Sequence, residues 1–296
     1  MNRKIQVGAE AFDRRQVGLL RLTNGDKVSF GEVSPLPGLS RESLADVTTL
    51  SEKFPSVEWG IRSAQKNALD RPARRVDLCA LLLEDELSPT EQSLEFEKAG
   101  FTTLKIKVGS DLDADLAKLG GILQKTNKIK LRLDFNRRCS REEILRFSSE
   151  LKSFTESGRI EYFEDPCLSS DRDLEMGFEA AVDEGVVSAN PNDNRWFVVK
   201  PTITGSTFIE SLPANKKFIL SSAYESNLGI FSAGQAALDW NRGPWAHGLD
   251  TGKYFGENLF EMKIHGGQLH LPSDVWVRAT LTQLTSGLKP LVEREI

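Results

Sequence analysis

Charged side chains close a series of short apolar runs in this 296-residue chain. Lys107 ends TTLKIK and Lys200 ends WFVVK, while acids end three runs between them: Asp134 in KLRLD, Glu164 in IEYFE and Asp183 in AAVD. Because side chains alternate between the two faces of a strand, each charge would lie opposite its apolar neighbours. Charges inside a structure must be paired or bound to metal. The pattern therefore predicts a site that holds a metal ion and transfers a proton.

Carboxylates without neighbouring histidine or cysteine are hard oxygen ligands, which suit Mg²⁺ or Mn²⁺ better than zinc. We therefore predict that Asp134, Glu164 and Asp183 bind Mg²⁺, with Mn²⁺ as a possible substitute. Glu184, next to Asp183, is an alternative third ligand. A bound cation would stabilise the charge that develops when a proton leaves the carbon beside a substrate carboxylate.

The spacing of the charges predicts the scaffold that positions them. Helix-like stretches at 111–125 and 140–154 fill the intervals between the first three charged strand ends. Strands that alternate with helices at this pitch form a parallel sheet, and a barrel gathers their C-terminal ends at one face. We expect an α/β fold with a parallel sheet, in which the five charges would converge on one point if the sheet closes into a barrel and would lie in a row if it stays open. Only 13 residues separate Asp183 from Phe197, so that unit of the barrel should be trimmed.

Several motifs occur in an order that resembles the enolase superfamily, and within it the muconate-lactonising subgroup with its o-succinylbenzoate synthases. They are K-x-K at 105–107, R-x-D-x-N at 132–136, E-D-P-C at 164–167, V-K-P-T-x-T-G at 199–205, GEVSPLPGLS at 31–40 and GLDT at 248–251. The resemblance extends from about residue 15 to about residue 272. It implies a (β/α) barrel of the modified TIM type with an α+β capping domain over its mouth. We predict the cap at 1–95, the barrel at 96–265, and a C-terminal segment at 266–296 that returns to the cap.

The resemblance also implies a reaction. It is the Mg-dependent dehydration of 2-succinyl-6-hydroxy-2,4-cyclohexadiene-1-carboxylate to o-succinylbenzoate in menaquinone biosynthesis, through α-proton abstraction and a metal-stabilised enediolate. Lys107 would take the α-proton and return it to the departing hydroxyl. Lys200 would stay protonated on the opposite face of the substrate and stabilise the developing charge. Lys105 would keep positive charge near the substrate carboxylate.

Three further residues are candidates for substrate binding. Arg132 lies on the same strand face as Asp134, where it would contact substrate or orient that carboxylate. Ser221 and Ser222 end the run KKFILSS, where they would contact substrate or cap a strand.

Other activities share the same residues. A racemase of N-succinylamino acids or an epimerase of dipeptides would use the same metal and lysine pair. Leu249-Asp250-Thr251-Gly252 lacks the D-x-D that such dipeptide epimerases carry, which disfavours that reading. A muconate-type cycloisomerase and a catalytically silent binding barrel are weaker alternatives.

Composition agrees with a soluble enzyme of the cytoplasm. The net charge of −5 argues against nucleic-acid binding, and no run reaches the roughly 18 apolar residues of a membrane span. The N-terminal residues lack the apolar core of a signal peptide. Cys79, Cys139 and Cys167 follow no metal-binding spacing and are expected to be free thiols. The expected partner is a small-molecule carboxylate, and the sequence does not indicate an oligomeric state.

Overall fold

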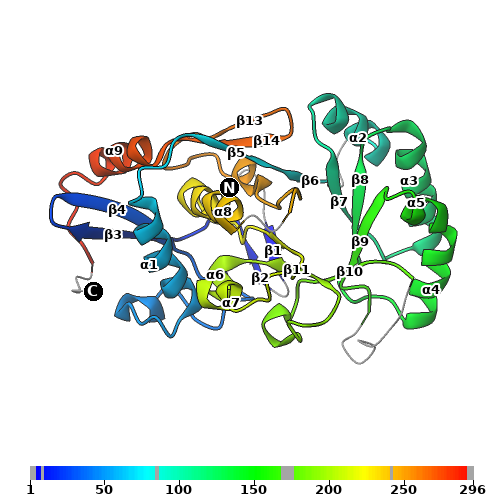
Figure 1. Cartoon of the computed structure of the whole chain (residues 1–296), viewed down its shortest axis with the longest axis horizontal. Coiled ribbons are helices and arrows are strands. Elements are labelled where there is room, and N and C mark those ends of the chain that lie inside the picture. Colours follow the sequence, from blue (N-terminus) through cyan, green and yellow to red (C-terminus); the bar gives the residue numbers. More distant parts are fainter. Residues whose placement is uncertain (1–4, 8–9, 84–86, 168–176, 241–242, 292–296) are drawn as a thin grey trace.

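The centre of the fold is a parallel sheet of neighbouring strands in the order β12-β11-β10-β9-β8-β7-β6 (Figure 1). The computed structural model describes residues 5–7, 10–83, 87–167, 177–240 and 243–291. The strands are β6 (Cys79–Leu81), β7 (Thr103–Lys107), β8 (Lys130–Asp134), β9 (Ile160–Glu164), β10 (Ala180–Val182), β11 (Trp196–Val199) and β12 (Phe218–Leu220).

The sheet closes on itself through one short segment. His247 forms a parallel bridge with Leu78 beside β6, and Gly248 forms one with Ser221 beside β12. The backbone of Cys79 donates to His247, and Ser222 donates to Gly248. This closure confirms the predicted α/β barrel.

Helices cover the outside of the barrel, and α2 to α5 lie along one side of the molecule in Figure 1. The helices are α2 (Pro89–Lys98), α3 (Leu112–Lys125), α4 (Arg141–Glu150), α5 (Lys152–Glu156), α6 (Pro201–Thr204), α7 (Ser206–Glu210) and α8 (Asn227–Trp240). The helices predicted at 111–125 and 140–154 are thus confirmed. Between β10 and β11 the chain forms only the 3₁₀ helix η3 (Val186–Ser188), so the trimmed unit is confirmed as well.

Capping residues explain where these helices begin. The hydroxyl of Ser88 accepts from the backbone of Glu91, whose side chain accepts in return from the backbone of Ser88. Ser140 and Glu143 form the same reciprocal pair at the start of α4. Such pairs satisfy backbone N–H groups that have no partner within the helix.

A second group of elements lies at the end of the molecule opposite α2 to α5 (Figure 1). The hairpin β3 (Gly18–Asn24) and β4 (Lys27–Val33) packs against α1 (Pro55–Asn67), and α9 (Asp274–Leu284) also contacts β4. The remaining strands are β1 (Ile5–Val7), β2 (Glu10–Phe12), β5 (Arg74–Asp77), β13 (Lys263–His265) and β14 (Gln268–Leu271), and the remaining 3₁₀ helices are η1 (Asp46–Thr49) and η4 (Asp250–Tyr254). The barrel sheet already includes β6, which precedes residue 96, and the division into domains stays a prediction.

The barrel strands are apolar toward the helices, as alternation predicts. Leu104, Ile106, Leu131 and Leu133 belong to the large core that includes Phe147 of α4. A separate cluster of Tyr162, Ala181, Trp196, Val198 and Ile219 fills the inside of the barrel. Among the described residues, no helix is both long and apolar enough to cross a membrane.

Candidate active site

The C-terminal ends of three neighbouring strands bring charged residues side by side. In the register of the sheet, Lys107 of β7 is the partner of Asp134 of β8, and Asp134 is the partner of Glu164 of β9. Asp183 directly follows β10, and Lys200 directly follows β11. The strand order therefore places all five predicted residues at one end of the barrel, where barrel enzymes have their active sites.

Lys105 links two of the carboxylates. Its Nζ lies 2.8 Å from Oδ2 of Asp134 and 2.7 Å from Oε1 of Glu164. Although burial opposes it, the negative charges of Asp134, Glu164 and Asp183 raise the pKa of Lys105 well above its ordinary value. Lys105 is thus a fixed ammonium among the carboxylates.

The third carboxylate is paired separately. Lys200 donates to Oδ1 of Asp183 in an ion pair that is largely shielded from solvent. Although burial opposes the change, Lys200 and then Lys105 hold the pKa of Asp183 below its ordinary value. Glu184, the alternative ligand, extends toward Arg137 at 3.7 Å and is 54% exposed. The structure therefore brings Asp183, and not Glu184, to the lysines.

Lys107 differs from the other two lysines. Its side chain is exposed at the end of β7. Within the described part of the chain it forms no hydrogen bond or ion pair. Its ammonium or amine is consequently available to a bound molecule.

The surroundings of Glu164 are suitable for binding a cation. Its side chain is 1% exposed, and its Oε2 atom has no hydrogen-bond partner among the described residues. Burial raises the pKa of Glu164 to about 8; Lys105 opposes this change, while Asp134 and Asp183 add to it. An unpartnered carboxylate oxygen beside two more acids is a suitable donor set for a hard divalent cation. Across the described ranges no three acidic, thiol or imidazole groups lie close enough together to hold a metal ion; the three carboxylates are ion-paired with Lys105 and Lys200.

Arg132 does not join this cluster. Its side chain is 1% exposed, its Nε donates to Oε2 of Glu161 at 2.5 Å, and its guanidinium lies 5.1 Å from the ring centre of Tyr162. It precedes Asp134 by two residues, so it occupies a deeper layer of the barrel. Among the described contacts Arg132 has none with Asp134, and substrate contact by Arg132 stays a prediction.

The two serines take part in barrel closure. The hydroxyl of Ser222 donates to the carbonyl of Gly248 at 3.2 Å and lies 2.7 Å from that of Thr251. Ser221 is the bridge partner of Gly248. These contacts match the strand-capping alternative, and substrate contact by Ser221 or Ser222 stays a prediction.

Asp165 is a supporting residue that the sequence reasoning did not single out. Its Oδ2 accepts from the backbone of Glu184 at 2.8 Å, and its Oδ1 lies 3.6 Å from Nη2 of Arg137. Burial raises its pKa to about 6, although the bond from Glu184 opposes this. Asp165 therefore ties the loop after β9 to the loop after β10. The available signal was its position in E-D-P, directly after the predicted ligand Glu164 and on the opposite face of the strand.

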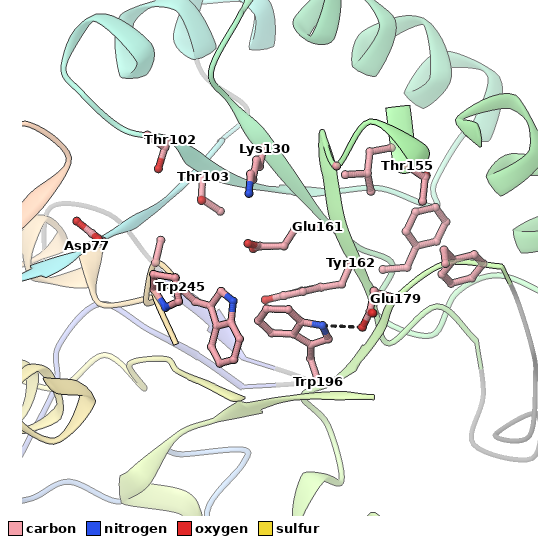
Figure 2. Close-up of a pocket in the computed structure, with 16 residues that line it drawn as sticks. Asp77, Thr102, Thr103, Lys130, Thr155, Glu161, Tyr162, Glu179, Trp196 and Trp245 are labelled. Carbon is pink, nitrogen blue, oxygen red and sulfur yellow. Dashed lines mark hydrogen bonds between the residues drawn. The ribbon is translucent and has the colours of Figure 1, made fainter. Parts of the chain in front are cut away.

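A cavity of about 410 Å³ lies at the other end of the barrel. Thr103, Lys130, Ile160 and Trp196, which each begin a strand, contribute to its wall. Figure 2 shows the oxygens of Glu161 and Tyr162 directed into the space near Lys130 and Trp245. This cavity is separated from the carboxylates by the length of the strands, so it is not the predicted site.

Comparison of the sequence with known proteins identifies the family that this chain resembles. Residues 90–184 match the family described as enolase C-terminal domain-like. The o-succinylbenzoate synthase of Yersinia pseudotuberculosis serotype I is 30% identical over 270 residues, which cover 79% of this chain and 81% of that protein. That of Pectobacterium atrosepticum is 29% identical over 269 residues, with the same shares.

Solved structures share the fold. The o-succinylbenzoate synthase of Thermosynechococcus elongatus BP-1, complexed with Mg in its active site, has a TM-score of 0.68 at 23% identity and covers 83% of this chain and 88% of its own. A dipeptide epimerase from Enterococcus faecalis V583 has a TM-score of 0.67 at 19% identity, with shares of 92% and 95%. At these identities the likeness concerns the fold alone.

Proposed function

Because the chain belongs to the o-succinylbenzoate synthase family of the enolase superfamily, we propose that it dehydrates 2-succinyl-6-hydroxy-2,4-cyclohexadiene-1-carboxylate to o-succinylbenzoate. The observation that carries the proposal is the contrast between two lysines. Lys107 is exposed and unpaired among the described residues, whereas Lys200 is held by Asp183. An elimination needs one mobile base and can use one fixed cation. A racemisation needs two lysines that both exchange protons. The product would serve menaquinone biosynthesis.

Lys107 performs both proton transfers in this reaction. In its neutral form, its Nζ accepts the α-proton of the substrate, and the C–H electron pair moves toward the carboxylate to give an enediolate. This electron pair then returns to form the new ring double bond as the C–O bond to the hydroxyl breaks. The resulting ammonium then donates the same proton to the hydroxyl, which departs as water. One base thus serves as acid and base in turn, and no net proton is gained or lost.

The paired lysines supply fixed charge. Lys200, anchored on Asp183, presents positive charge from a strand end two strands beyond that of Glu164. Lys105, anchored on Asp134 and Glu164, keeps positive charge in the floor of the site. Fixed charges at the place where negative charge develops are the main means by which a site lowers such a barrier.

Asp134, Glu164 and Asp183 would hold Mg²⁺, or Mn²⁺ in its place. When bound, the cation would draw charge from the substrate carboxylate and so acidify the adjacent C–H bond. The chain's own residues would orient the substrate so that this bond faces Lys107.

An absorbance assay tests the proposal. We expect the purified protein with Mg²⁺ to remove the diene absorbance, and EDTA to stop the reaction. We expect Lys107→Ala to lower kcat by about 10²–10⁴-fold, which is what proton transfer by a positioned base contributes. Lys130→Ala is the matched control, because Lys130 is an exposed lysine at the start of β8, at the opposite end of the barrel. Equal activity of Lys107→Ala and the control would contradict the assigned role.

Two experiments distinguish dehydration from the racemisation of N-succinylamino acids, which would use the same residues. With Lys200→Arg, which preserves the charge, we expect measurable dehydration to remain. If the wild-type protein instead leaves the diene unchanged but exchanges the α-proton of N-succinylamino acids in D₂O, the racemase interpretation replaces the proposal.

A further inference from the structure

Two of the cysteines lie next to each other at the mouth of the barrel. Cys139 is in the loop after β8, five residues beyond Asp134, and Cys167 is in the loop after β9, three residues beyond Glu164. The backbone pairs them directly, because Cys139 and Cys167 are partners in an isolated parallel bridge. Residues 28 apart in sequence are thus brought together by the order of the strands.

The geometry of such a bridge suits a covalent link. Neighbouring strands lie about 4.8 Å apart, and residues paired in parallel carry their side chains on the same face. Disulfides join residues whose Cα atoms are about 4.4–6.8 Å apart. The third cysteine, Cys79, lies in β6 at the barrel wall and is paired with Thr103 of β7. It serves as an internal comparison.

The two thiols have different surroundings. Cys139 is 6% exposed, and its Sγ lies 3.1 Å from the point where a Cβ on Gly109 would stand, in the turn after Lys107. Burial, followed by the charges of Glu143 and Asp115, raises the pKa of its thiol to about 11. Cys167 is more accessible than Cys139. An oxidant from solvent would therefore reach Cys167 first.

We propose that Cys139 and Cys167 form a reversible disulfide when the protein meets hydrogen peroxide. The thiolate of Cys167 attacks one peroxide oxygen, which breaks the O–O bond and gives a sulfenic acid and water after protonation. The sulfur of Cys139 then attacks the Cys167 sulfur and releases the second water. Two thiols are oxidised by two electrons as one hydrogen peroxide is reduced to two waters. The link joins the loops that follow the strands of Asp134 and Glu164.

Peptide mapping of the full-length protein tests this. The fully reduced protein is treated with one equivalent of hydrogen peroxide, is unfolded in the presence of the alkylating reagent so that all remaining thiols are blocked, and is digested with trypsin. We expect the peptide of residues 139–141 to be joined to that of residues 160–172, with two hydrogen atoms lost. Dithiothreitol should restore both thiols to alkylation.

Three variants make the result specific. Cys139→Ser and Cys167→Ser should each abolish the joined peptide, and Cys79→Ser should leave its yield unchanged. The wild-type peptide map identifies the pair even where a variant folds poorly. Peroxide treatment that yields only sulfinic acid, a link between chains, or a link to Cys79 overturns the proposal.

Discussion

Acid should weaken this fold through His247, which lies in the segment that closes the barrel. Its side chain is 8% exposed, and its Nδ1 accepts from the backbone of Leu220 at 3.0 Å. Burial and, secondarily, the charge of Arg132 lower the pKa of His247 from 6.5 to about 3. The imidazole therefore stays neutral in the folded protein under conditions where it is charged in the unfolded chain.

The sign and size of the effect follow from proton linkage. Between about pH 6.5 and pH 3 the unfolded chain binds a proton at His247 that the folded protein does not bind. The free energy of unfolding consequently falls as the pH falls through this window. At about pH 5, which is about 1.5 units below the unfolded pKa, the loss due to His247 is about 2 kcal/mol.

Urea unfolding of the wild type and of His247→Asn isolates this contribution. The asparagine oxygen can accept from Leu220 but cannot take up a proton, so the variant should be less stable than the wild type at about pH 7.5. At about pH 5 the difference between the two proteins should shrink by about 2 kcal/mol, because only the wild type pays for keeping its side chain neutral. An equal loss of stability in both proteins would refute the assignment.

Two other changes probe the packing that supports the site. Arg132→Met leaves the carboxylate of Glu161 without its cation and should cost about 3–5 kcal/mol in urea unfolding, whereas adding Glu161→Gln should recover much of that loss. Gly31→Ala would place a Cβ 2.0 Å from the carbonyl oxygen of Gly60, where α1 meets β4, and should cost at least about 1–3 kcal/mol. The matched change Gly120→Ala, where no atom lies within 4 Å, should stabilise α3 by up to about 1 kcal/mol.

The strand pattern was sufficient to predict a parallel sheet and the end of its strands at which the charges gather, and the family resemblance added the barrel. Alternation within TTLKIKV and KLRLD separates Lys105, Lys107 and Asp134 from the apolar positions, and the order of parallel strands makes their ends neighbours. This reasoning needs only local periodicity and the rule that such ends share one face of a barrel.

The strand pattern could not predict how deep inside the barrel a charged side chain lies. Arg132 and Asp134 lie on the same face of β8, but Arg132 pairs with Glu161 in a lower layer. A period of two residues identifies a face and not a layer, and the partner Glu161 stands at an irregularity in the register between β8 and β9. The closing segment could be predicted only as a late strand around His247, because His247 and Gly248 make isolated bridges rather than a longer ladder.

The backbone at the strand ends explains how the site keeps its orientation. Asn136, Arg137 and Asp165 have φ angles of 48°, 58° and 41°, in the left-handed region that is uncommon for residues with a side chain. Bonds hold these turns in place: the backbone of Asn136 donates to Oδ1 of Asp134 at 3.1 Å, and that of Arg137 donates to the carbonyl of Asp165 at 2.8 Å. Strained conformations of this kind persist where the surroundings fix them. The bond from the backbone of Asn136 directs Oδ1 of Asp134 toward the loop and leaves Oδ2 to Lys105. The unfavourable backbone conformation of this turn therefore helps to orient a side chain that is predicted to bind the cation.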